Sequence, residues 1–203
     1  MRMGLLLFSF FSLFYSSAQS SIDCKEWKLK YESGTYKMYM RECAYSPIKE
    51  VKVVDKFNGD FKHLQQVMED IETAKKMVES CKEARLLEQI DKNSSLEYYS
   101  YKMPVGVKDR DIVTKTTTHS TDSTYSYVSE TLENSSVALR SNFIRIKNAR
   151  SAWFFKKMAT GDIEMEYVAF ADPNGKIPAW LINSLARNQV RASITKLKKL
   201  VND

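Results

Sequence analysis

The C-terminal part of the chain decides the fold, and it reads IEMEYVAFADPNGKIPAWLINSLARNQVRASITKLKKLV over residues 163–201. Apolar and polar residues first alternate toward Phe170, which predicts a β-strand. The residues DPNG at 172–175 have the chemistry of a tight turn and end that strand. From Pro178 onward, apolar residues recur every three or four positions, which predicts one amphipathic helix over 178–201. A sheet strand is therefore followed directly by a long helix with one apolar face.

The same period of two dominates the chain upstream of this stretch, back to residue 84. It predicts strands over residues 84–90, 96–103, 112–119, 125–132, 137–146, 152–158 and 163–170. Two earlier strands are expected over residues 35–41 and 48–57. Between these two groups lies a helical insertion that begins at the N-cap residue Asp60 and continues as a second short helix toward Cys81. A further short helix is expected over residues 23–31.

This order of elements predicts an α+β fold, in which a curved antiparallel sheet of about nine strands carries a long C-terminal helix over it. Long antiparallel sheets twist and curl, so a helix that crosses such a sheet encloses a space against it. Side chains fill a small space of this kind, whereas a larger one holds a ligand. The last helix is therefore either an ordinary core helix or a lid, and both roles require one apolar face.

The first residues of the chain have the pattern of a signal peptide. Arg2 precedes an apolar run over residues 5–15, and small residues follow at 16–20. Such a run is shorter than the ~20 residues that a membrane-spanning helix needs, although an uncleaved membrane anchor is the alternative. We predict a signal peptide over residues 1–20 and one domain over 21–203 that is exported, either to the periplasm or out of the cell.

Three cysteines remain in the predicted mature chain: Cys24, Cys43 and Cys81. Export permits a disulfide, and a bond between Cys24 and Cys43 would tie the N-terminal segment to the first strand. Three buried thiols are the alternative. No Cys-x-x-Cys spacing occurs, so the cysteines do not indicate a zinc or redox site.

Four patches of the sequence carry a resemblance to a known family. They are residues 48–53 (IKEVKV), Pro104 followed by 109–113 (DRDIV), Ile144-Arg145 with Trp153 downstream, and 172–183 (DPNGKIPAWLIN). In this order and spacing they resemble the START (StAR-related lipid transfer) domain, a helix-grip fold, over residues 24–201. The resemblance implies an apolar tunnel that binds one sterol, phospholipid or other lipid.

The resemblance also implies where polar and moving parts of the site lie. Some START domains place a buried carboxylate against a buried arginine near the ligand's polar end. Glu97 corresponds to that carboxylate, but Thr116 stands where the arginine would be. A buried Glu97 without a cation is costly, so it must be protonated, hydrated or paired with another group. Residues 119–124 and the helix over 178–201 correspond to parts that gate the tunnel.

Strand alternation gives independent support for this site, because residues at every second position share one face of a sheet. Glu97 shares a face with two tyrosines of its own strand, and further aromatic residues alternate in the later strands. The predicted ligand-binding residues are Glu97, Tyr99, Tyr101, Thr116, Tyr125, Tyr127, Met165, Tyr167, Ile182 and Leu185. The alternative is that these rings only fill the core.

The sequence predicts binding rather than catalysis, with no cofactor and no metal. His63 falls in a polar helical stretch and His119 beside a turn, and no nucleophile elbow, zinc-protease motif or phosphate loop occurs. One alternative is a helix-grip enzyme that resembles aromatase/cyclases and acts on a bound apolar substrate. A second is a basic surface-binding protein that uses Arg187, Arg191, Lys196, Lys198 and Lys199.

The net charge of +6 and the isoelectric point near 9.1 are compatible with acidic partners. We expect a lipid or apolar small molecule as the ligand, and transient contact with an anionic membrane. No nucleic-acid-binding motif is present, so nucleic acid is not an expected partner. The chain is expected to act as a monomer.

Overall fold

The computed structural model describes residues 24–132 and 135–203, which form ten strands and three helices. The strands are β1 (Lys28–Ser33), β2 (Tyr36–Cys43), β3 (Ser46–Asn58), β4 (Cys81–Asp91), β5 (Ser94–Tyr101), β6 (Asp109–Ser120), β7 (Thr124–Thr131), β8 (Phe143–Arg145), β9 (Asn148–Lys157) and β10 (Asp162–Asp172). The helices are α1 (Phe61–Glu69), α2 (Thr73–Met77) and α3 (Ala179–Asn202). The predicted signal peptide over residues 1–20 lies outside the described residues.

One curved sheet contains all the strands. Nine of them follow the order β1-β2-β3-β10-β9-β7-β6-β5-β4, and each neighbouring pair in this path is antiparallel. Pairing between β3 and β10 joins the beginning of the chain to its end. The predicted fold class, an antiparallel sheet in helix-grip form with a long C-terminal helix, is confirmed.

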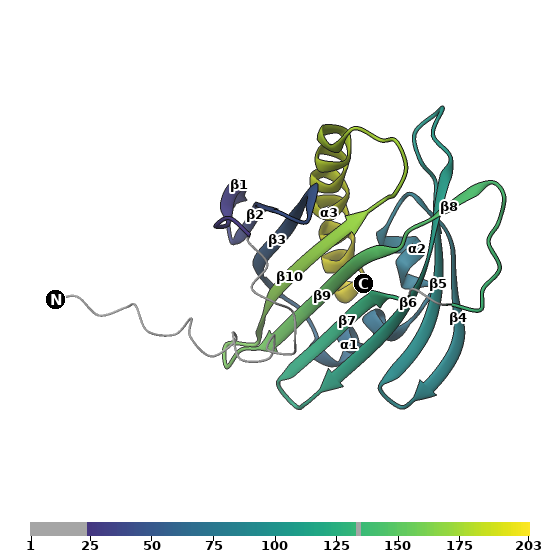
Figure 1. Cartoon of the computed structure of the whole chain (residues 1–203). Helices are drawn as coiled ribbons and strands as arrows, with labels where there is room; N and C mark the ends of the chain where they lie inside the picture. The colour runs from purple at the N-terminus through teal and green to yellow at the C-terminus, as the bar shows by residue number, and fades with distance from the viewer. Residues whose placement is uncertain (1–23, 133–134) are drawn as a thin grey trace.

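The three helices lie against one face of this sheet, which we call the inner face (Figure 1). Helix α1 begins as predicted at Asp60, whose carboxylate accepts a hydrogen bond of 2.6 Å from the backbone N–H of His63. Helix α3 places Ile194, Leu197 and Val201 in the main apolar cluster, together with residues of α1, β2, β3, β7, β9 and β10. The predicted apolar stripe of the last helix is therefore the surface that covers the sheet.

Both ends of α3 are fastened to the rest of the molecule by polar contacts. Near its start, the side-chain oxygen of Asn183 accepts a hydrogen bond of 2.8 Å from the backbone N–H of Lys49. Near its end, Lys198 forms an ion pair of 2.9 Å with the buried Asp55. Of the five basic residues considered for surface binding, Lys198 is therefore engaged with the sheet, although its side chain remains 35% exposed. No helix within the described ranges has the length and apolar character needed to cross a bilayer.

The predicted helix over residues 23–31 is wrong, because part of this segment forms the edge strand β1. Its six residues are all exposed, so no buried face selected a helical period. The strand instead gains backbone hydrogen bonds by pairing with β2. A disulfide between Cys24 and Cys43 holds the start of the segment against the end of β2, and Cys81 remains a free thiol.

The predicted strand over residues 137–146 is also largely wrong. Only β8, Phe143–Arg145, is a strand, and it pairs in parallel with the beginning of β6. The residues before it form bends and a turn, with Leu139 77% exposed. Residues 137–142 have no neighbouring strand that would complete their backbone hydrogen bonds, so their apolar content alone did not make a strand.

Candidate functional site

The inner face of the sheet carries eight of the ten predicted ligand-binding residues. Direct cross-strand partners share a face, and the registers pair Glu97 with Thr114, Thr116 with Ser129, and Tyr127 with Trp153. Tyrosines and methionines of the later strands continue the same face across the sheet. The eight residues are Glu97, Tyr99, Tyr101, Thr116, Tyr125, Tyr127, Met165 and Tyr167.

The carboxylate of Glu97 is the polar centre of this face. Its side chain is only 6% exposed, and four hydroxyl groups from three strands donate hydrogen bonds to it. Ser95 donates to Oε1 at 2.8 Å. Tyr99, Thr116 and Tyr127 donate to Oε2 at 2.7, 2.8 and 2.9 Å, respectively. A buried Glu97 without a cation was expected to be protonated, hydrated or paired with another group. The structure provides the third of these, because a shell of neutral hydroxyls surrounds the carboxylate.

The four hydroxyls that contact Glu97 can all act as donors toward the carboxylate. Thr116 lies between Glu97 and Ser129, whose hydroxyl is 2.6 Å away. If Thr116 gives its proton to Glu97, Ser129 supplies the proton for the second contact. A carboxylate is an acceptor only, so all four hydroxyls that contact Glu97 can donate to it at the same time.

The tyrosines of the cluster are kept in their neutral, proton-donating form. Burial, and then the neighbouring Tyr127 and Glu97, raise the pKa of Tyr99 far above its usual range. Burial and the charge of Glu97 also raise the pKa of Tyr127 to about 12. Burial alone raises the pKa of Tyr167 to about 12. These phenols therefore remain donors throughout the physiological pH range.

Aromatic rings surround the polar centre. Tyr99 and Tyr101 are stacked, with ring centroids 6.4 Å apart. On the neighbouring strands, Trp153 lies 4.1 Å from Tyr167 and 5.9 Å from Phe155, centroid to centroid. Glu97 also lies at a boundary, because Tyr99 belongs to one apolar cluster and Tyr127 packs against another. The arrangement combines one carboxylate with wide apolar walls on either side.

The two predicted site residues of α3 lie apart from this centre. Ile182 packs with Ile48 and Phe170 in a separate cluster at the start of the helix, and Leu185 is half-buried. A role for either residue in ligand binding remains a prediction.

Sequence reasoning missed three hydroxyl residues of the site: Ser95, Thr114 and Ser129. Ser95 was taken as part of a turn, although it alternates with Glu97 and so shares its face. Thr114 and Ser129 likewise alternate with Thr116 and Tyr127. The hydroxyl of Thr114 is buried and has no hydrogen-bond partner, whereas that of Ser129 contacts Thr116. Extending the two-residue period by one step would have found all three.

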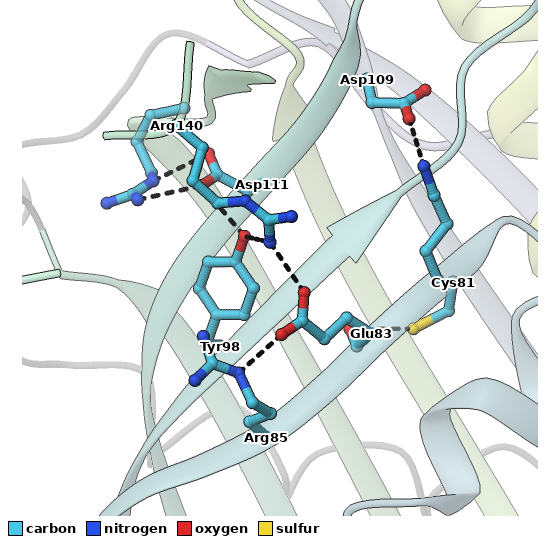
Figure 2. Close-up of polar contacts among 9 residues, drawn as sticks. Cys81, Glu83, Arg85, Tyr98, Asp109, Asp111 and Arg140 are labelled. Carbon is cyan, nitrogen blue, oxygen red and sulfur yellow. Dashed lines mark hydrogen bonds and ion pairs between the residues drawn. The ribbon is translucent and has the colours of Figure 1, made fainter. Parts of the chain in front are cut away.

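The outer face of the same strands carries a different polar network, which is structural. Figure 2 shows that the Tyr98 hydroxyl donates to Asp111 and accepts from Arg140, which also donates to the Glu83 carboxylate. Asp111 is 1% exposed and forms a two-pronged ion pair with Arg145 at 2.9 Å for both contacts. This network fastens the segment before β9 to the sheet, on the side opposite the helices.

Arg110 lies on the inner face of β6, and its guanidinium donates to backbone carbonyls of the linker that joins β10 to α3. The Pro173 carbonyl accepts at 2.6 Å and the Asn174 carbonyl at 2.8 Å. A Cβ at Gly175 would lie 3.4 Å from the same guanidinium, and the φ of Gly175 is +82°. Glycine at this position therefore lets the linker approach Arg110 closely.

Two crevices open beside the helices. One, of about 200 Å³, lies between α2 and α3 and is lined by Met77, Val78, Glu79, Asn188, Gln189, Ala192 and Ser193. The other, of about 370 Å³, lies where α1 meets the turn after β6, next to the hydrogen bond of 2.8 Å that Gln65 donates to Ser120. The second crevice adjoins the loop over residues 119–124, for which a gating role remains a prediction.

Comparison with known proteins identifies the family. The model of the START domain matches residues 14–202. An uncharacterised protein of Pseudomonas aeruginosa is 26% identical over 87% of this chain and 85% of its own length. Human START domain-containing protein 10 is 22% identical over 67% of this chain but only 47% of its own length.

Solved structures show the same fold. A STAR-related lipid transfer protein fragment from Xanthomonas axonopodis superposes with a TM-score of 0.77 at 21% identity, covering 87% of this chain and 99% of that one. Human StAR-related lipid transfer protein 5 gives a TM-score of 0.78 at 16% identity, covering 87% and 86%. The match of the START model to nearly the whole sequence, together with this fold, establishes that the chain belongs to the START domain family.

Proposed function

We propose that this protein binds one lipid or other bulky apolar molecule between α3 and the inner face of the sheet. It acts as a carrier or sensor, and the bound molecule directs its polar end toward Glu97. The ten residues predicted from the sequence, from Glu97 to Leu185, are candidates for the contacts.

A single observation carries this proposal: some interior side chains retain accessible surface. Tyr101, Tyr127 and Tyr167 pack against the apolar clusters of the inner face, yet each is only partly buried. Side chains packed solidly in a core lose this area, whereas those that line an interior hollow keep it. Half-buried apolar residues of the helices face the same cluster, including Val67, Val78, Ala186 and Val190. Apolar walls of this kind stabilise a ligand by about 25 cal/mol per Å² of buried surface.

Family membership supports the same reading. The relatives from Xanthomonas and human are themselves described as lipid transfer proteins. These similarities concern the fold, so the nature of the ligand has to be inferred from the site of this chain. We further propose that cleavage after the leader at residues 1–20 releases the protein outside the cytoplasm, where it works as a monomer. Transient contact with anionic membranes would deliver the ligand.

The test is native mass spectrometry of the purified mature protein, before and after incubation with vesicles of mixed phospholipid and sterol. We expect a second species, heavier by the mass of one lipid, which organic extraction removes and identifies. A spectrum that contains only the unliganded mass under both conditions would reject the proposal.

The same experiment distinguishes a carrier from an enzyme. An aromatase/cyclase from Streptomyces shares the fold with a TM-score of 0.56 at 8% identity, and Glu97 is the polar centre of the inner face that such chemistry could use. A lipid recovered unchanged after prolonged incubation supports the carrier, whereas a product of altered mass would favour the enzyme.

A further inference from the structure

We propose that the ligand's polar end is a protonated amine that carries N–H donors, received by the carboxylate of Glu97 and the hydroxyl of Thr114. This inference rests on the proposed binding function and specifies the chemical class of the ligand. The relevant probes are amphiphiles with one alkyl chain and one ammonium group.

The first argument is that Glu97 lacks the cation that every comparable acid has. Four carboxylates are buried in the described part of the chain: Glu50, Asp55, Glu97 and Asp111. Three of them have basic partners from this chain. Glu50 pairs with Arg41 and Arg150, Asp55 with Lys198, and Asp111 with Arg145. Glu97 forms no ion pair among the described residues and receives neutral hydroxyls only, so its negative charge is solvated but not compensated.

The second argument is that unused hydrogen-bonding capacity lies beside this charge. Three donors reach Oε2 of Glu97, but only Ser95 reaches Oε1. Oε1 can accept at least one more donor. Thr114 is the direct cross-strand partner of Glu97, and its hydroxyl is buried without a partner. A buried hydroxyl left in this state costs free energy, and a donor from the ligand would satisfy it.

The third argument is the aromatic surroundings. The stacked rings of Tyr99 and Tyr101 and the ring of Tyr127 line the space around the carboxylate. The low polarity of these aromatic walls strengthens an ion pair with Glu97. A primary ammonium group fits all three features because it has a positive charge and three N–H donors. A neutral alcohol would satisfy the hydrogen bonds but leave the charge of Glu97 without a counterion. A phosphate or carboxylate end would be repelled by that charge.

The experiment compares amphiphiles that differ only at the polar end. Binding of dodecylamine, dodecanol and dodecyltrimethylammonium to the mature protein is measured by isothermal titration at neutral pH, where the amine is protonated. The alcohol and the amine can both donate a hydrogen bond to Glu97, but only the amine compensates its charge, so we expect dodecylamine to bind at least about tenfold more tightly than dodecanol. The trimethylammonium compound should fall below dodecylamine because it has no N–H to donate.

Two variants locate the effect. Glu97→Gln should remove most of the preference for dodecylamine over dodecanol. Glu164→Gln is the matched control, because it removes one negative charge from an exposed position on β10 and should leave the preference intact. Thr114→Val should weaken the binding of dodecylamine severalfold. This variant tests the proposal independently if Glu97→Gln does not fold.

The outcomes separate this inference from the function on which it rests. Equal binding of amine and alcohol, or tighter binding of the trimethylammonium compound, would overturn the proposal of an amine ligand. The proposed lipid binding would remain. If neither dodecylamine nor dodecanol binds, the proposed function itself fails.

Discussion

Individual residues on the two faces of the sheet solve the same electrostatic problem in different ways. Buried acids that hold the fold together, such as Glu50 and Asp111, have arginine partners. Glu97, on the inner face, has hydroxyl partners instead. Arginine partners neutralise a charge within the protein itself, whereas hydroxyls stabilise it but leave it able to attract a cation. The choice of partner therefore marks Glu97 as the group suited to a ligand.

Two threonines on β6 provide a matched test of the hydroxyl shell. Thr116→Val removes the donor to Glu97 and leaves Ser129 without its partner, so it should cost about 1–3 kcal/mol of unfolding free energy. Thr114→Val removes a hydroxyl that has no partner and should be neutral or slightly stabilising in lipid-free protein. Urea unfolding of both variants provides the measurement. Equal losses for the two would show that the hydroxyl shell does not hold Glu97.

Glu50 should make stability dependent on acid pH. Burial acts to raise the pKa of Glu50, but hydrogen bonds from Tyr45, Arg41 and Arg150 outweigh it, so the pKa lies below the usual 4.5. A carboxylate whose pKa is lowered by folding stabilises the protein above its unfolded pKa, and this contribution is lost as the pH falls further. Glu50→Gln should therefore be less stable at pH 7 by about 3–5 kcal/mol, and the gap to wild type should close below about pH 4.5.

The control for this experiment is Glu42→Gln. Hydrogen bonds from Lys25 and Lys49 lower the pKa of Glu42 to about 2, but this residue is exposed, so salt screens its ion pairs. In 1 M salt its effect on stability should disappear while that of Glu50 persists. Parallel pH curves for wild type and Glu50→Gln would contradict the account of Glu50.

At the scale of elements, most of those that the sequence predicted have a period matched by a buried face, although the mostly exposed β4 was also predicted. The strands from β2 to β10 other than β8, both parts of the helical insertion and α3 fell close to their expected positions. The failures, β1 and the segment before β8, have exposed residues, so periodicity carried no information there. The secondary structure of such segments depends on strands that are distant in the sequence and pair with them. The sequence alone does not reveal this pairing.

The disulfide should stabilise the edge strand β1. It closes a loop with a sequence separation of 19. Such a cross-link restricts the unfolded chain and thereby raises the free energy of unfolding by about 3 kcal/mol. The double variant Cys24→Ser/Cys43→Ser should unfold at correspondingly lower denaturant concentration than oxidised wild type. Unchanged stability would show that the N-terminal segment is not fastened by this bond.

Movement of α3 should control how fast a ligand exchanges, if this helix is the predicted lid. A Cβ at Gly59 would lie 2.7 Å from Cγ1 of Val201, so cysteines at these two positions would bring a sulfur within bonding reach. Oxidised Gly59→Cys/Val201→Cys should transfer a fluorescent lipid between vesicles more slowly than either single variant. Transfer at an equal rate would reject α3 as the gate and leave the loop over residues 119–124 as the moving part.

At the scale of the whole molecule, the site is a product of curvature, which strand periods do not encode. Alternation placed Glu97 with Tyr99 on one face of their strand, but only the assembled sheet brings hydroxyls of β5, β6 and β7 to one carboxylate. The resemblance to START domains supplied the position of Glu97, and that of Thr116 where the family's arginine would be. It did not supply the hydroxyl shell, because that shell replaces the arginine that the family pattern led us to look for.

The central claim is that the interior between α3 and the inner face holds an amphiphile whose polar end meets Glu97. The most direct measurement is a crystal structure of the mature protein grown with dodecylamine. The account predicts density for an alkyl chain along Tyr101, Tyr127 and Tyr167, with the nitrogen within hydrogen-bond distance of Oε1 of Glu97. Side chains that close on one another across this space, with no density between them, would contradict it.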